Sequence, residues 1–101
     1  MSLNKSLSPD GKLFTIQIKG KFDFNLVQAF RTAYSEVGNE TPKVVVDLRE
    51  TDYMDSSALG MLLNMKKFLG ESVTSIQIAN CRPQIKKILQ ISRFDKKFDI
   101  D

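Results

Sequence analysis

The sequence contains no histidine and no tryptophan, and only one cysteine, among its 101 residues. Without histidine, a Ser-His-Asp catalytic relay cannot form. A single cysteine and no histidine supply too few ligands for a zinc site. The lone Cys81 cannot form an internal disulfide, which is typical of proteins from a reducing compartment. We therefore expect no metal, no cofactor and no histidine-dependent catalysis.

Long apolar runs and a strong excess of charge of one sign are also missing. No run approaches the roughly 18 apolar residues of a membrane span, and the first residues lack the apolar segment of a secretory signal. The net charge is only +3 and the basic residues are dispersed, so we expect no direct nucleic-acid binding. The sequence has no glycine-rich phosphate loop, so we expect no small-molecule substrate. With 101 residues and 42% hydrophobic content, the chain is expected to form a single domain over residues 1–101. The single cysteine and the absence of a span or signal make a cytoplasmic location the expectation.

Hydrophobic periodicity predicts several strands. Residues 2–8 and 13–19 flank a turn signal at Pro9-Asp10-Gly11 and are expected to form a β-hairpin that Gly20 ends. Residues 43–48 form a continuous apolar run, which favours a strand buried on both faces. Shorter strands are expected at residues 74–79 and 98–100.

Helical spacing of apolar residues predicts three helices, at residues 24–37, at residues 58–69 and from Pro83 onward. Asp23 is the expected N-cap of the first helix, and Gly38-Asn39 its end. The element order β-β-α-β-α-β-α-β predicts an α/β fold. We expect a mixed sheet of four to five strands with an N-terminal β-hairpin and about three crossover helices covering at least one face.

The most informative segment lies between the apolar run and the second helix. Residues 49–54 are expected to form a loop that delivers Asp55, Ser56 and Ser57 to the helix start. Backbone N–H groups converge there, and the helix dipole favours negative charge. Capping requires only one of these side chains. If Ser57 is the cap, Ser56 is left exposed.

Enzymatic interpretations of the two serines are weak. The G-x-S-x-G elbow is absent, and Ser56 and Ser57 lack the S-x-x-K spacing of lysine-assisted nucleophiles. A carrier protein with a prosthetic arm on Ser56 is disfavoured, because carrier domains are acidic helical bundles and this chain is basic with alternating strands. We expect that the chain is not an enzyme.

Other residues have two interpretations each. Asp23 is either a helix cap alone or also a second acidic group near Ser56, if the two strands are neighbours. Met54 and Met61 are core residues, or Met61 serves a partner interface, because methionine adapts to varied surfaces. The pairs Lys66-Lys67 and Lys86-Lys87 are solvated helix faces or a basic docking surface for an acidic partner.

These residues together resemble a known family. The run Tyr53-Met54-Asp55-Ser56-Ser57-Ala58-Leu59-Gly60, after Val44-Val45-Val46-Asp47-Leu48, resembles the signature of STAS domains of the anti-sigma factor antagonist type. The segment Gly20-Lys21-Phe22-Asp23 is similar to the early Gly-x-x-Asp element of that family. The chain departs from the family pattern at Lys21, where an acidic residue is frequent, and at Ala58, where glycine is common.

The resemblance implies a STAS fold and a phospho-switch at Ser56. The partner would be an anti-sigma factor and serine kinase of the partner-switching type, and a serine phosphatase would restore the hydroxyl. The unphosphorylated form would bind the partner, and phosphate would block binding. Other residues would support the phosphosite or the partner interface, namely Asp23, Asp55, Ser57, Met54, Ala58 and Met61. The alternative is a constitutive protein-interaction or scaffolding module in which both serines only cap.

Overall fold

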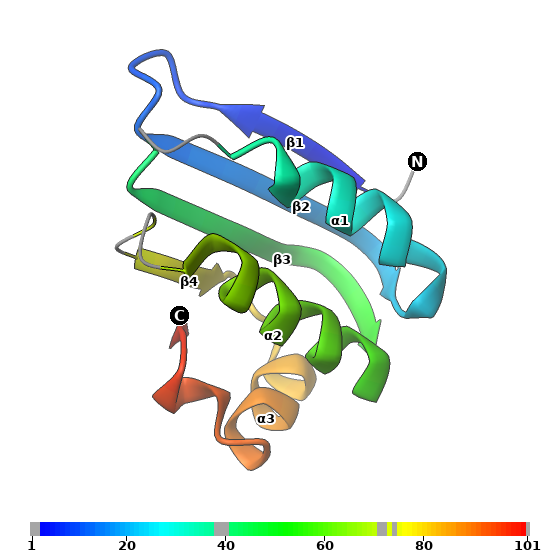
Figure 1. The fold of residues 1–101 in the computed structure, drawn as a ribbon. Helices are drawn as coiled ribbons and strands as arrows, with labels where there is room; N and C mark the ends of the chain where they lie inside the picture. Colours follow the sequence, from blue (N-terminus) through cyan, green and yellow to red (C-terminus); the bar gives the residue numbers. More distant parts are fainter. Residues whose placement is uncertain (1–2, 38–40, 71–72, 74, 101) are drawn as a thin grey trace.

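The computed structural model describes residues 3–37, 41–70, 73 and 75–100. The elements are β1 (Leu3–Leu7), β2 (Leu13–Phe22), the 3-10 helix η1 (Phe24–Leu26), α1 (Val27–Ser35), β3 (Lys43–Met54), α2 (Ser56–Leu69), β4 (Ser75–Ala79), α3 (Pro83–Ile91), the 3-10 helix η3 (Phe94–Lys96) and β5 (Asp99–Ile100). The predicted order β-β-α-β-α-β-α-β is confirmed (Figure 1).

The five strands form one sheet in the order β1-β2-β3-β4-β5. Strands β1 and β2 pair antiparallel as the predicted hairpin, and all other neighbours are parallel. Because the strand order follows the chain, successive right-handed crossovers place their helices on the same side of the sheet. Figure 1 shows α1 and α2 side by side over the sheet, with α3 next to α2.

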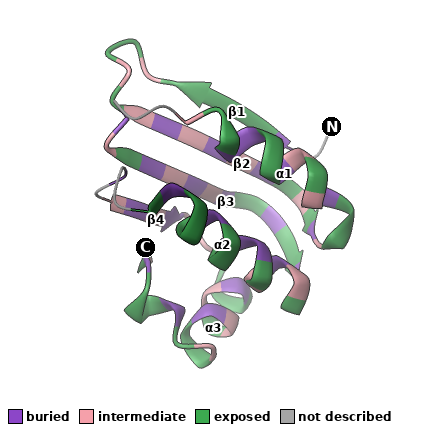
Figure 2. Cartoon of the chain, in the orientation of Figure 1, coloured by how far each residue is buried: buried purple, intermediate pink, exposed green. Residues whose placement is uncertain are grey.

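The core lies between these helices and one face of the sheet. On β3, Val44, Val46 and Leu48 are fully buried, whereas Val45 and Asp47 between them are only half-buried. Figure 2 shows this alternation along β2 and β3. The prediction of a strand buried on both faces is therefore wrong. The continuous apolar run led to this error because it includes Val45, which lies on the face of the sheet that is partly open to solvent.

Both central strands are longer than the sequence predicts. Strand β2 continues through Gly20, at φ +81°, to Phe22, and β3 continues to Met54. The β2–β3 pairing accommodates this with register shifts on either side of residues 19–20. The predicted strand end at Gly20 and the predicted loop at residues 49–54 are both wrong. Glycine adopts positive φ without steric cost, so here it shifts the register instead of ending the strand.

A buried threonine joins the outer halves of these strands. Thr51 is fully buried, and its hydroxyl donates to the Ile18 carbonyl at 2.8 Å. The polar side chain is thus satisfied within the core. It fixes the path of β3 just before the strand reaches the start of α2.

The helix ends agree only in part with the predictions. Gly70 at φ +56° ends α2, and Pro83 opens α3, as expected. The expected first helix is divided into η1 and α1, and α2 begins at Ser56, ahead of the expected start. The predicted end at Gly38-Asn39 lies outside the described residues. Within the described ranges, no helix has the length and apolar character needed to cross a membrane.

Candidate functional site

Two acidic residues leave the sheet next to each other. Phe22 at the end of β2 is paired with Met54 at the end of β3, so Asp23 and Asp55 emerge from neighbouring strands. The expectation that these two segments lie side by side is confirmed. Each carboxylate accepts a backbone N–H two residues ahead, Asp23 from Asn25 and Asp55 from Ser57, both at 3.0 Å. Both aspartates are therefore N-caps.

Asp55, rather than Ser57, caps α2. The Oδ1 atom of Asp55 accepts the Ser57 N–H and also the Ser57 hydroxyl, the latter at 2.5 Å. The expected capping role of Ser57 is thus wrong, because its hydroxyl donates to the residue that caps. The hydroxyl of Ser57 is also the main cause that lowers the pKa of the Asp55 carboxyl. Ser57 acts here by holding the cap in its charged form.

Ser56 has different surroundings from its neighbour. Its side chain is exposed, whereas Ser57 and Asp55 are half-buried. Among the described residues, no hydrogen bond restrains the Ser56 hydroxyl. Ser56 is the first residue of a helix of 14 residues, where the helix dipole favours negative charge. An external enzyme could therefore reach this hydroxyl and leave a negative group on it.

Tyr53, for which the sequence predicts no role, also borders the site. Its hydroxyl donates to Asp55 Oδ2 at 3.4 Å, and the Lys21 ammonium lies 5.9 Å from the centre of its ring. The negative charge of Asp55 is the largest cause that raises the pKa of Tyr53. Lys21 and Tyr53 are paired across β2 and β3. The sequence could have indicated the position of Tyr53 beside the site only if residues 49–54 had been predicted as a strand.

The remaining expected site residues lie in the core. Met54 and Met61 are buried, and Ala58 is fully buried. For Met61, the structure thus favours the core interpretation over an exposed one. By contrast, Phe24 directly follows Asp23 and is 70% exposed. The surface around Ser56 therefore combines two carboxylates with the exposed aromatic rings of Phe24 and Tyr53.

The site contains no arrangement suited to activating Ser56 internally. The chain has no histidine. The described part of the chain holds no group of three or more His, Cys, Asp or Glu that could bind a metal. The Asp55 carboxylate is held by Ser57 and Tyr53.

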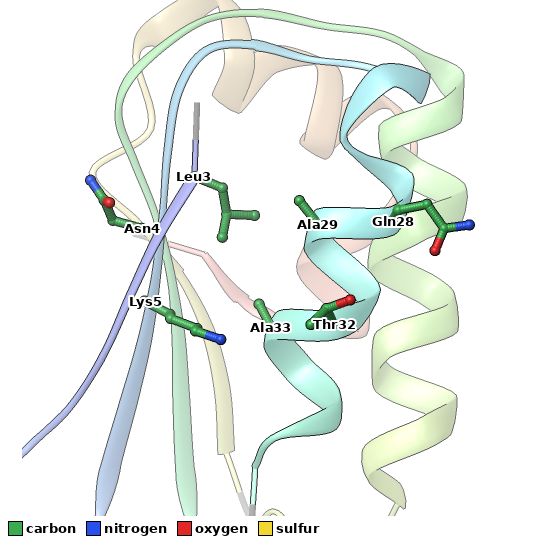
Figure 3. Close-up of a pocket in the computed structure, with 7 residues that line it drawn as sticks. All are labelled: Leu3, Asn4, Lys5, Gln28, Ala29, Thr32 and Ala33. Carbon is green, nitrogen blue, oxygen red and sulfur yellow. The ribbon is translucent and has the colours of Figure 1, made fainter. Parts of the chain in front are cut away.

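A separate groove of about 600 Å³ lies between β1 and α1 (Figure 3). Its lining residues are mostly small or neutral, namely Leu3, Asn4, Lys5, Gln28, Ala29, Thr32 and Ala33. Lys5, the one charged residue among them, is ion-paired with Glu36. Among its lining residues, the groove brings together no cluster of titratable groups.

Comparison with known proteins gives consistent matches over nearly the full length. The family model described as "Mlab, STAS domain" matches residues 6–100. A STAS-domain containing protein of Pseudomonas aeruginosa (strain UCBPP-PA14) is 47% identical over 100 residues, which cover 99% of each chain.

Solved structures share the fold at low sequence identity. The anti-sigma factor antagonist SpoIIAA in its unphosphorylated form matches with a TM-score of 0.74 at 17% identity, over 98% of this chain and 86% of that chain. The phosphorylated form of SpoIIAA, from Bacillus, matches with a TM-score of 0.67 at 16% identity, over 98% and 90% of the two chains. A putative anti-sigma factor antagonist from Thermotoga maritima matches with a TM-score of 0.80 at 14% identity, over 97% and 84%.

Proposed function

The chain belongs to the STAS domain family, and on that premise we propose that it is a protein-interaction module switched by phosphorylation of Ser56. The unphosphorylated form binds a partner protein, and phosphate on Ser56 blocks that binding. The observation that supports this most directly is the division of roles at the start of α2. Asp55 caps the helix with help from Ser57, so the exposed Ser56 hydroxyl is not needed for folding.

The partner we propose is an anti-sigma factor and serine kinase of the partner-switching type, and a serine phosphatase reverses the modification. The likeness of the fold to SpoIIAA, which has been solved with and without phosphate, supports this choice. The chain itself carries out no catalysis in this scheme. The exchange takes place in the cytoplasm, where a kinase finds its nucleotide substrate.

The physical basis of the switch is a charge placed inside an interface. Phosphate adds about −1.5 to −2 charge at neutral pH, beside the carboxylates of Asp23 and Asp55. In the free protein, water and the start of α2 stabilise that charge. In a desolvated interface, an unpaired charge costs on the order of 3–5 kcal/mol, which corresponds to about two to three orders of magnitude in affinity. The switch therefore needs no refolding of the domain.

The proposal is tested by capturing partners from the native cell with four baits. We expect Ser56→Ala to retain the partner constitutively, and Ser56→Asp to lose most of it. Wild type should retain the partner according to its phosphate content, measured on the same sample by mass spectrometry. Ser57→Ala is the matched control, because it removes a neighbouring hydroxyl that should not carry phosphate.

Equal capture by wild type, Ser56→Ala and Ser56→Asp would contradict the switch. If Ser56 also carried no phosphate in the native cell, the chain would instead be a constitutive interaction or scaffolding module.

A further inference from the structure

The basic residues of the chain are concentrated in its second part. Residues 61–101 contain eight lysines and arginines against four acidic residues, whereas residues 1–60 contain seven against eight. The net positive charge of the protein therefore comes entirely from the segment that forms most of α2, β4, α3 and the C-terminal elements. Ser56 belongs to the first part of the chain, residues 1–60, as do Asp23 and Asp55.

Three of these lysines surround one hollow. The hollow has a volume of about 340 Å³ and lies at the C-terminal end of α2, lined by Leu63, Lys66, Lys67, Gly70 and Lys97. Lys66 and Lys67 belong to the last turn of α2. Lys97 directly follows η3, so a separate element brings the third ammonium to the same place.

Stabilisation of the helix end explains only part of this arrangement. Lysines in a last turn interact favourably with the helix dipole, which accounts for Lys66 and Lys67. Lys97 is not part of α2 and has no such role there. Among the described residues, the only ion pair joins Lys5 to Glu36, so none of the three lysines has a carboxylate partner within that part of the chain. Three like charges around one hollow repel one another until an anion enters it.

One of the lysines is held in place by the core. The Lys66 ammonium lies 5.8 Å from the centre of the Phe98 ring, and Phe98 is only 5% exposed. A cation over an aromatic face is attracted by the ring. Lys66 therefore has less freedom than an ordinary surface lysine, and part of the hollow is formed before any ligand arrives.

We propose that this hollow binds an acidic segment of a partner protein. Its shallow, open shape and partly apolar wall at Leu63 suit the carboxylate and methylene groups of a glutamate or aspartate side chain. A nucleic acid is less suited, because the lining has no exposed aromatic ring for base stacking. The hollow and Ser56 lie at opposite ends of α2, separated by about 15–20 Å at the helical rise per residue. Binding at the hollow is consequently independent of the Ser56 switch.

The test measures binding of a short polyglutamate peptide to the full chain. In the wild type, we expect the amide NMR signals of Leu63, Gly70 and Lys97 to shift on titration. The double variant Lys67→Gln/Lys97→Gln should weaken binding about tenfold, because two partly exposed charge contacts are lost. Lys66 is left in place because it also packs on Phe98. Binding should also disappear near 1 M salt, where screening acts over about 3 Å.

The matched control is Lys86→Gln/Lys87→Gln, which removes the same charge from α3 outside the hollow and should change the affinity little. Equal weakening by both double variants would show diffuse attraction to a basic surface and overturn the proposed hollow. Inorganic pyrophosphate that shifted the same signals at lower concentration than the peptide would show a small-anion site instead. Ser56→Asp should leave peptide binding unchanged, so the outcome is separable from that of the phospho-switch.

Discussion

At the residue scale, two adjacent serines are used in different ways. Ser57 donates both its N–H and its hydroxyl to Asp55, and it is half-buried. Ser56 is exposed and makes no such contact with the cap. A group added to Ser56 therefore need not disrupt the hydrogen bonds that start α2. The phosphate that we propose at Ser56 would therefore change the surface and leave the helix intact.

The role of Ser57 gives a prediction about the charge of Asp55. Replacing Ser57 with alanine removes the hydroxyl donor and keeps the backbone N–H, so we expect the pKa of the Asp55 carboxyl to rise towards its usual range. A carboxyl whose pKa is lowered by folding stabilises the protein above its unfolded-state pKa, and this stabilisation is lost as pH falls through the folded-state value. Wild type should therefore exceed Ser57→Ala in stability at neutral pH, and the difference should shrink in acid.

Carboxyl carbon NMR titration measures the pKa directly, and thermal unfolding at neutral and strongly acidic pH measures the stability difference. Ser56→Ala is the control, because among the described residues no hydrogen bond joins Ser56 to the carboxylate, and the substitution should leave the pKa of Asp55 unchanged. Identical titrations of Asp55 in Ser57→Ala and wild type would contradict the assigned role of the hydroxyl.

Residue-level predictions from the sequence suggested that Asp23 and Asp55 lie close together, but they did not give the hydrogen bonds of the site. The sequence suggested the proximity of Asp23 and Asp55 only if their two strands are neighbours, and the pairing of β2 with β3 meets that condition. The choice of Ser57 as the cap was wrong, and the sequence offered little ground for it, because aspartate and serine are about equally favoured at that position. The contact of Tyr53 with Asp55 depends on the end of β3, which the sequence did not reveal.

At the scale of elements, the outer half of β3 has the largest effect on the site. The polar residues Arg49, Glu50 and Asp52 are exposed, so this stretch has the composition of a loop. Its strand structure comes from pairing with β2, in a register that shifts on either side of residues 19–20. The hydrophobic periodicity of one strand cannot reveal a bulge in the neighbouring strand. The inner half, residues 43–48, was predictable because apolar burial itself specifies it.

Thr51 offers a test of how the outer half is held. Its buried hydroxyl donates to the Ile18 carbonyl at 2.8 Å, and valine would fill the same volume without this donor. We expect Thr51→Val to lower the free energy of unfolding by about 1–3 kcal/mol, since a buried carbonyl loses its partner. Urea unfolding measures the change. Thr51→Ser, which keeps the hydroxyl, is the comparison variant, and a Thr51→Val protein as stable as wild type would contradict the role of this bond.

At the scale of the whole molecule, the fold has two unequal faces. Helices α1 and α2 cover the apolar face of the sheet (Figure 2). The opposite face carries half-buried, mostly polar side chains such as Thr15, Gln17 and Asp47. The sequence predicted helices on at least one face without deciding between one and two. Because the strand order follows the chain, all crossovers can lie on the same side, and one layer of helices is enough for the core.

This asymmetry predicts unequal costs for two neighbouring substitutions on β3. Val46→Ala removes two methyl groups from a fully buried side chain, and we expect a loss of about 2 kcal/mol in the free energy of unfolding. Val45→Ala makes the same chemical change on the half-buried face and should cost less than about 1 kcal/mol. Both variants lose the same β-branched side chain from the same strand, so intrinsic strand preference cancels in the comparison.

Urea unfolding of the isolated chain measures both values. Equal losses would mean that the second face is also packed, and the one-sided arrangement of helices would then be incorrect.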